Sequence, residues 1–189
     1  MSKSGKIIVV VAPSGTGKST LIKKILHDIP EMVWSVSCTT RPMRTGEVDG
    51  KDYHFVSVED FEARLKKGEF IEWAKVHDNY YGTSKVIVDE TLNQGLNILM
   101  ELDVQGCDSL KKIYAKTAQV IFLEPPSMEL LEKRLRDRAT DSEEVILRRL
   151  NNAKSEMTRK NDFDYLMTND DIDHAYKRFF SIVSEILGR

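Results

Sequence analysis

The chain has 189 residues, a length typical of one compact domain. Its hydrophobic fraction of 41% argues against disorder, and no apolar run approaches the ~20 residues that a membrane span needs. The net charge of −2, from 28 basic and 30 acidic residues, gives no basic footprint for duplex nucleic acid, so we expect neither nucleic acid nor a membrane as a partner.

The N-terminal residues lead directly into a strand-like run, without the apolar stretch and cleavage site of a secretory signal. We therefore expect a cytoplasmic protein. The two cysteines, Cys38 and Cys107, lie far apart and outside any CxxC or Cys/His cluster, which predicts reduced thiols and no structural zinc site. The sequence leaves open whether the protein is a monomer or a homodimer.

The first predicted elements are a strand, a glycine loop and a helix. Residues 6–12 (KIIVVVA) form a β-branched apolar run typical of a strand that is buried on both faces of a parallel sheet. Residues 13–17 are turn formers, and from Lys18 apolar residues recur at helical spacing until Pro30. This order is the usual opening of an α/β domain.

The loop between this strand and helix matches a phosphate-binding motif. Residues 12–19 (APSGTGKS) fit G-x-x-x-x-G-K-[ST] except that Ala12 replaces the first glycine. Glycines let backbone N–H groups close around phosphate oxygens, and the helix directs its positive end at the same anion. We expect Lys18 to reach the β- and γ-phosphates and Ser19 to bind Mg²⁺. The predicted ATP-binding residues are Ala12, Pro13, Ser14, Gly15, Thr16, Gly17, Lys18, Ser19 and Thr20.

The region of residues 36–90 has a different pattern. In order, it predicts a turn at 48–51, a strand at 51–58, a short helix at 58–65, a strand at 70–74 and a turn at 80–82. We interpret it as a small mixed α/β insert on the main sheet.

Two further apolar runs, residues 98–100 and 119–123, are each followed by helical patterns. Strands that alternate with helices predict a parallel, doubly wound sheet, in which ligands bind at the carboxyl ends of the strands. Residues 127–158 predict a charged helical hairpin, with Ser127 as an N-cap and Asp141 with Glu144 as a capping box that restarts the helix.

Several motifs follow the phosphate loop in a fixed order. They are SVSCTTRPMR at 35–44, GEVDGKDY at 46–53, GEFIEW at 68–73, NYYGT at 79–83, DVQG at 103–106, and PPS at 125–127 with an arginine-rich stretch to Arg149. With these motifs the chain resembles the guanylate kinase family from about Lys6 to its C-terminus.

The resemblance implies one P-loop NTPase domain over residues 1–189. Its expected parts are a core (1–36, 91–126 and 159–189), a GMP-binding insert (37–90) and a helical lid (127–158). It further implies an enzyme that transfers the γ-phosphoryl group of ATP to GMP, and to dGMP as well, directly, in line and with Mg²⁺ as cofactor.

Arg41 and Arg44 suit the phosphate of GMP, because guanidinium groups bind such anions bidentately. The resemblance adds the hydroxyls of Tyr53 and Tyr81. On the residues alone, a solvated arginine pair and packed aromatic rings are the alternatives.

Glu72 is the expected specificity residue, since an ionised carboxylate accepts hydrogen bonds from both N1–H and the 2-amino group of guanine. Without the family motif, a surface glutamate is the simpler interpretation. The resemblance places Ser37, Thr83 and Asp103 at the base, and Glu101 near Mg²⁺ and the phosphates, directly or through water. The predicted GMP-binding residues are Ser37, Arg41, Arg44, Tyr53, Glu72, Tyr81, Thr83, Glu101 and Asp103, and the predicted metal ligands are Ser19 and Glu101.

The lid is rich in arginine, and Arg134 and Arg138 are four residues apart, on one helix face. The resemblance implies that they and Arg149 neutralise charge on the transferred phosphoryl group. A solvated helix face is the alternative. The predicted catalytic residues are Lys18, Arg41, Arg134, Arg138 and Arg149.

Other function classes fit the sequence less well. A guanylate kinase-like protein-binding module typically loses the loop lysine and the lid arginines, which this chain retains. A ribose bisphosphate kinase of the same fold should lack the base-reading residues. A switch GTPase should carry an N-K-x-D motif, and none occurs in the sequence.

Overall fold

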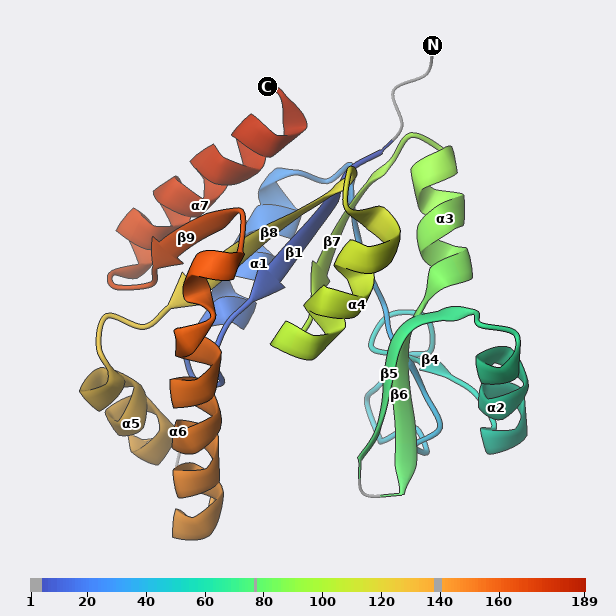
Figure 1. Cartoon of the computed structure of the whole chain (residues 1–189), viewed down its shortest axis with the longest axis horizontal. Helices are drawn as coiled ribbons and strands as arrows, with labels where there is room; N and C mark the ends of the chain where they lie inside the picture. The colour runs from blue at the N-terminus through green and yellow to red at the C-terminus, as the bar shows by residue number, and fades with distance from the viewer. Residues whose placement is uncertain (1–4, 77, 138–140) are drawn as a thin grey trace. The chain divides into compact units, whose positions relative to one another are not determined.

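The computed structural model describes residues 5–76, 78–137 and 141–189, drawn in Figure 1. These residues form an α/β fold that divides into two compact units. Unit 1 contains the chain up to Ile7, Glu31–Glu101 and Gln105–Ala118, and unit 2 contains Ile8–Pro30, Leu102–Val104 and Gln119–Arg189. Parallel strand pairs occur in both units, so the predicted α/β class with parallel strands is confirmed.

In unit 1, β2 (Met32–Trp34) and β7 (Asn97–Glu101) pair in parallel, with Val33 opposite Ile98. The Ile98 N–H also donates to the Lys6 carbonyl at 2.8 Å. Helices α3 (Lys85–Asn93) and α4 (Val104–Tyr114) precede and follow β7 in the chain. The middle of β7 is buried, as expected for the apolar run at 98–100.

A second sheet in unit 1 has the strand order β4-β3-β6-β5. The strands are β3 (Cys38–Thr39), β4 (His54–Phe55), β5 (Phe70–Val76) and β6 (Asn79–Ser84). Helix α2 (Val58–Lys66), predicted at 58–65, begins after Ser57, whose Oγ accepts the Asp60 N–H at 3.0 Å. Phe61 of α2 stacks on Phe70 with ring centroids 4.2 Å apart, and Cys38 completes this core.

Two predictions in this sheet are wrong. Residues 80–82 do not form a turn but lie within β6, because the Tyr80 ring stacks on Phe61 and holds the segment in the sheet. The chain reverses before β6 instead, where Asp78 has a φ of 65°. The strand expected at 51–58 is limited to β4, since the Asp52 N–H closes a turn on the Val48 carbonyl.

In unit 2, β1 (Ile7–Val11), β8 (Ala118–Glu124) and β9 (Tyr165–Thr168) are neighbours in that order. Every residue of β1 is buried, as its β-branched run predicts. Helix α1 (Lys18–Asp28) follows the glycine loop, and α7 (Ile172–Leu187) follows β9. β8 and β9 pair in parallel with Leu123 opposite Met167, so both end at the same edge of the sheet.

The segment of unit 2 that was predicted to be a lid contains a hairpin of α5 (Met128–Asp137) and α6 (Glu143–Thr158), which lie side by side in Figure 1. Its own small core consists of Leu131, Leu135, Ile146, Leu150 and Ala153. The Ser127 cap is confirmed, because its Oγ accepts the Leu130 N–H at 3.2 Å. The predicted capping box is wrong: Ser142 is the N-cap of α6, and Asp141 instead pairs with Arg149 at 3.4 Å. A 3₁₀ turn (Lys160–Asp162) then leads to β9.

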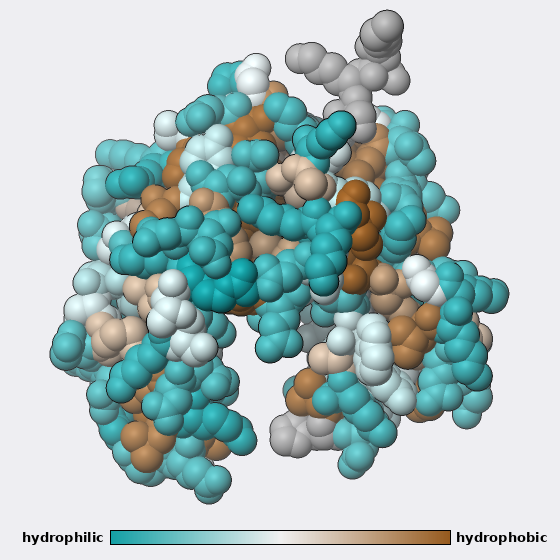
Figure 2. All heavy atoms as spheres, in the orientation of Figure 1, coloured by the Kyte–Doolittle hydropathy of each residue, from teal (hydrophilic) through white to brown (hydrophobic). Residues whose placement is uncertain are grey.

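The face shown in Figure 2 is mostly hydrophilic, with apolar residues in scattered places. This agrees with the burial of the apolar strand residues. In the described part of the chain, no helix has both the length and the apolar character of a membrane span.

Candidate active site

The glycine loop of unit 2 has a backbone that only glycine adopts without strain. Gly15 and Gly17 both have a φ of 91°, in the left-handed region. A Cβ added at Gly17 would lie 2.7 Å from Asn169 Nδ2. Thr16, between them, is fully buried, and its Oγ1 donates to the Pro13 carbonyl at 2.7 Å. The loop is therefore shaped by its own sequence, as the motif predicts.

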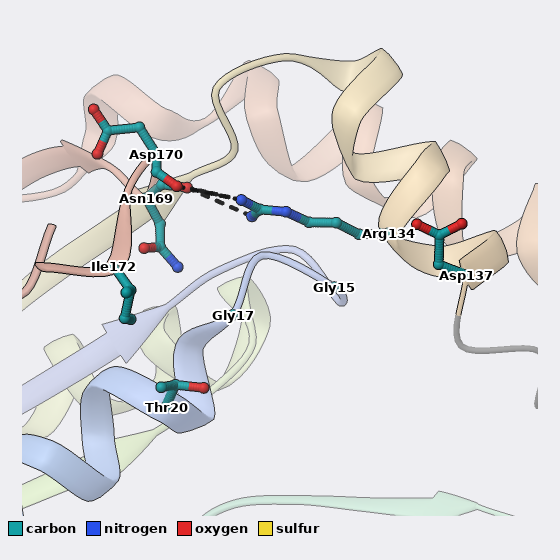
Figure 3. Close-up of a pocket in the computed structure, with 8 residues that line it drawn as sticks. All are labelled: Gly15, Gly17, Thr20, Arg134, Asp137, Asn169, Asp170 and Ile172. Atoms are coloured by element: carbon teal, nitrogen blue, oxygen red, sulfur yellow. Dashed lines mark hydrogen bonds between the residues drawn. The ribbon is translucent and has the colours of Figure 1, made fainter.

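A pocket of about 440 Å³ opens beside this loop. Its lining residues come from the loop, α1, α5 and the β9–α7 connection: Gly15, Gly17, Thr20, Arg134, Asp137, Asn169, Asp170 and Ile172. Figure 3 shows Arg134 extending from α5 toward Asn169 and Asp170, above the two glycines. Its guanidinium donates to the Thr16 carbonyl at 3.3 Å and to the Asp170 carbonyl at 3.4 Å. These long bonds to backbone carbonyls hold the positively charged guanidinium of Arg134 next to the glycine loop.

Asn169 braces the loop and was missed at the sequence level. Its Nδ2 donates to the Thr16 carbonyl at 2.5 Å, and the residue is only 4% exposed. Asn169 directly follows β9, whose last residue, Thr168, pairs with Glu124 of β8. Ligands and polar side chains gather at the carboxyl ends of parallel strands. A polar residue directly after a strand is therefore the sequence signal from which Asn169 could have been predicted.

Three other predicted residues lie around the same loop. Lys18 Nζ donates to the Ala12 carbonyl at 3.4 Å, so its side chain folds back over the loop. Arg149 Nη1 donates to Ser14 Oγ at 3.0 Å, which brings α6 to the loop. Ser19 is exposed in the first turn of α1. Arg138 lies outside the described residues.

An unpredicted acid, Glu156 of α6, lies close enough to Lys18 to feel its charge. Glu156 Oε2 is buried and has no hydrogen-bond partner among the described residues. Burial raises the pKa of the Glu156 carboxyl, the charge of Lys18 opposes that rise, and the charge of Asp103 adds to it. Glu156 is seven residues after Arg149, on the same helix face, which is the face that reaches the loop.

Of the four residues predicted to read a purine base, Ser37, Glu72 and Thr83 belong to unit 1, whereas Asp103 belongs to unit 2. Glu72 and Thr83 are opposite one another on β5 and β6, and Thr83 Oγ1 donates to Glu72 Oε1 at 2.6 Å. Ser37 precedes Cys38, which pairs with Gly82. Ser37 itself lies just outside β3 (Cys38–Thr39). An acceptor carboxylate on β5 is therefore bonded to a hydroxyl on β6, and a second hydroxyl, of Ser37, directly precedes β3, the next strand of the sheet.

The residues predicted to bind a phosphate monoester also cluster in unit 1. The Arg41 guanidinium lies 5.5 Å from the Tyr53 ring centroid, and the Tyr53 and Tyr81 centroids are 5.9 Å apart. Glu47, which was not predicted, binds Arg41 with an N–O distance of 2.7 Å. This carboxylate is the main cause of the raised pKa of Arg41, and Arg41 in turn holds the pKa of Glu47 below its usual range.

The remaining predicted residues lie at the surface of their units. The Arg44 side chain is exposed, and its backbone N–H donates to Glu47 Oε2 at 2.8 Å. Glu101 is exposed at the end of β7 in unit 1. Asp103 is exposed and belongs to unit 2, with Lys18 and Glu156.

The donor set suits Mg²⁺ bound mainly by a nucleotide. Among the described residues, no three His, Cys, Asp or Glu side chains group as a metal site. The Ser19 hydroxyl and the Glu101 carboxylate are hard oxygen donors, the type that Mg²⁺ prefers. Mg²⁺ usually takes one or two protein oxygens and completes its shell with phosphates and water, so the Ser19 oxygen in unit 2 and the Glu101 oxygens in unit 1 are each of a type that fits that ion.

Comparison with known proteins gives a consistent result. The model of the family described as guanylate kinase matches residues 4–186. A guanylate kinase of Rickettsia felis is 46% identical over 183 residues, which cover 97% of this chain and 95% of the relative. One of Thermotoga maritima is 43% identical over 179 residues, covering 95% of this chain and 86% of the relative. The crystal structure of a guanylate kinase from Anaplasma phagocytophilum matches with a TM-score of 0.73 and 34% identity, over 97% of this chain and 86% of that chain.

Proposed function

The chain belongs to the guanylate kinase family, and on this premise we propose that it transfers the γ-phosphoryl group of MgATP to GMP, giving ADP and GDP. We expect dGMP to serve as a second acceptor. One observation carries the choice of acceptor. Tyr81 lies beside Tyr53, whose ring is close to the Arg41 guanidinium, and Thr83 is bonded to Glu72. Tyr81 and Thr83 are two positions apart on β6, so they share a face of that strand. One strand thus presents groups suited to a phosphate next to groups suited to guanine.

The phosphates of ATP are assigned to the glycine loop. Backbone N–H groups at Gly15 and Gly17 and the N-terminus of α1 attract the β- and γ-phosphate oxygens. Lys18, Arg134 and Arg149, which all contact the loop, supply positive charge around them. The pocket lined by Asn169, Asp170 and Ile172 accommodates the rest of the nucleotide.

GMP is assigned to the second sheet of unit 1. Glu72 accepts hydrogen bonds from guanine N1–H and the 2-amino group, and the bond from Thr83 fixes the carboxylate. Arg41, Arg44, Tyr53 and Tyr81 bind the phosphate. Adenine carries an acceptor at N1, which faces the carboxylate unfavourably, so AMP is rejected.

The reaction needs little acid–base chemistry. The attacking group is a phosphate oxygen of GMP, whose second pKa is about 6, so it is largely dianionic at neutral pH. Its bond to the γ-phosphorus forms as the bond from that phosphorus to the β–γ bridging oxygen breaks, and ADP leaves with the electron pair. The Ser19 hydroxyl of unit 2 would hold Mg²⁺, which would neutralise charge on the phosphates. Glu101 of unit 1 keeps its predicted role as a second oxygen donor to the ion. The cations of the loop and lid stabilise the transition-state charge.

A coupled assay of ADP release tests the proposal, with MgATP and each of GMP, dGMP, AMP, CMP and UMP as acceptor. We expect turnover with GMP and dGMP and little with the others. Preference for AMP would contradict the assignment of Glu72.

Lys18→Ala should lower kcat by about 100-fold or more, since it removes a charge that acts on the transferred group. The substitution should leave the fold intact by circular dichroism, because the bond from Lys18 Nζ to the Ala12 carbonyl, at 3.4 Å, is long and therefore weak. Unchanged turnover in this variant would exclude the loop as the ATP site.

A further inference from the structure

The carboxylate of Glu47 closes the loop that carries the phosphate-binding arginines. Glu47 Oε1 accepts from Arg41 Nη2 at 2.7 Å, and Glu47 Oε2 accepts from Arg41 Nη1 at 3.0 Å. The same Oε2 accepts the Arg44 backbone N–H at 2.8 Å. The side chains of Arg41 and Glu47 are only 12% and 20% exposed. One carboxylate therefore links both arginines and is well shielded from solvent.

The bonds of Arg41 to Glu47 and Pro42 do not use the Nε–Nη2 edge of its guanidinium. A guanidinium has five N–H donors in a fixed plane. The two Nη1 hydrogens go to the Pro42 carbonyl, at 2.8 Å, and to Glu47, and one Nη2 hydrogen goes to Glu47. The two remaining donors, on Nε and Nη2, form the other bidentate edge of the same plane. Glu47 occupies one fork of Arg41, and the Tyr81 hydroxyl also interacts with this guanidinium. An anion at the second fork would therefore meet Arg41 together with Tyr81.

The rings around Arg41 fix the orientation of that plane. Its guanidinium carbon lies 5.5 Å from the Tyr53 centroid and 5.7 Å from the Phe55 centroid. The Arg41 backbone N–H is bonded to Thr39 Oγ1 at 3.1 Å, and Thr39 is fully buried. The arginine is thus restrained at its backbone, at the rings and at one edge of its head group.

We propose that Glu47 is a positioning residue for the acceptor nucleotide: it holds Arg41 by the Nη1–Nη2 edge and so presents the Nε–Nη2 edge to the phosphate of GMP. This inference rests on the proposed function. Holding the arginine before binding removes most of the side-chain entropy that the phosphate would otherwise have to overcome. The negative charge of Glu47 would repel the phosphate, but the ion pair with the Nη1–Nη2 edge of Arg41 neutralises that charge. The lowered pKa of Glu47, which Arg41 causes, keeps it ionised at neutral pH.

The test is Glu47→Gln, with binding measured by calorimetry for GMP and for guanosine, which lacks the phosphate. An amide has one acceptor oxygen, so it cannot bind both Nη groups and the Arg44 N–H as the carboxylate does. We expect GMP to bind about 10-fold more weakly and KM for GMP to rise in parallel, whereas guanosine binding and KM for ATP stay unchanged. Glu47→Asp keeps the charge and should recover part of the GMP affinity.

Glu69→Gln is the matched control, because Glu69 also pairs with an arginine of unit 1, Arg64 at 3.3 Å. It should leave the ratio of GMP to guanosine affinity at the wild-type value. Equal weakening of GMP and guanosine by Glu47→Gln would mean a merely structural role and overturn the inference. Tighter GMP binding would overturn it too, because Glu47 would then compete with the phosphate for Arg41. Wild-type protein without GMP-dependent ADP release would instead refute the proposed function itself.

Discussion

Thr83 donates a hydrogen bond to Glu72 at 2.6 Å, across two paired strands of unit 1. Thr83 is almost fully buried, whereas Glu72 is half-buried at the edge strand of its sheet. The donor is therefore fixed and orients the more accessible carboxylate. A carboxylate held in this way can accept two parallel hydrogen bonds from one guanine edge, which is the basis of the first prediction.

Glu72→Gln should raise KM for GMP by about 10- to 100-fold and leave KM for ATP unchanged. The amide removes the charge and turns a donor toward the donors of guanine, which costs about 1.5–3 kcal/mol. Thr83→Val removes only the orienting bond, so KM for GMP should rise by less than about 10-fold. Steady-state kinetics with each substrate varied in turn measures both. Equal increases in the two KM values would contradict the role given to Glu72.

Asn169→Ala should weaken ATP binding and destabilise unit 2. The substitution leaves the buried Thr16 carbonyl without its shortest hydrogen bond, which costs about 1–3 kcal/mol of unfolding free energy. Denaturant titration measures that loss, and KM for ATP should rise without a change in KM for GMP. Asn152→Ala, at an exposed position of α6, is the control and should change neither value. Retained stability in Asn169→Ala would show that Asn169 does not brace the loop.

Gly17→Ala should abolish ATP binding, whereas Gly68→Ala should not. Both glycines have positive φ values, 91° and 69°, so alanine at either position adds backbone strain of about 1–2 kcal/mol. They differ in their surroundings: a Cβ at Gly17 would meet Asn169 Nδ2 at 2.7 Å, whereas nothing lies within 4 Å of one at Gly68. Thermal unfolding and ATP titration of both variants separate strain from steric conflict. Similar behaviour of the two would rule out a steric requirement at the loop.

Glu156→Gln should stabilise the protein at neutral pH and have little effect in acid. Burial raises the folded-state pKa of Glu156 above its unfolded value. Below the unfolded value both states are protonated and the group has no effect on stability. Between the unfolded and the folded pKa, the unfolded chain loses the proton of Glu156 while the folded protein keeps it. The free energy of unfolding therefore falls as pH rises through this window. Glutamine resembles the protonated form and avoids this loss.

The measurement is the unfolding free energy of wild type and Glu156→Gln at about pH 4 and about pH 8. The difference should be positive at the higher pH and close to zero at the lower. Glu144→Gln, at an exposed position in the first turn of the same helix, should give no stabilisation at either pH. A Glu156→Gln variant less stable than wild type at the higher pH would show that the electrostatic attraction to Lys18 outweighs the cost of burial.

The amino-acid sequence by itself determined the local features. The β-branched run of β1, the left-handed glycines at positions 15 and 17 and the Ser127 cap each depend on residues within a few positions of one another. Their physical causes are short-range: side-chain branching, backbone sterics and a hydroxyl within reach of the next helical turn. The same reasoning failed at residues 80–82, where stacking of Tyr80 on Phe61 of α2 decided between turn and strand.

Only the tertiary structure decided which distant groups meet. Asn169 reaches the Thr16 carbonyl across 153 positions, and Arg149 reaches Ser14 across 135. No periodicity or spacing encodes such contacts, because they depend on how strands and helices pack. Glu47 shows that a contact over a short sequence separation can also be unpredictable, since its bond to Arg41 spans six residues of irregular backbone. Irregular backbone has no repeating geometry from which side-chain contacts can be predicted. Only the tertiary structure therefore shows that Glu47 binds the Nη1–Nη2 edge of Arg41.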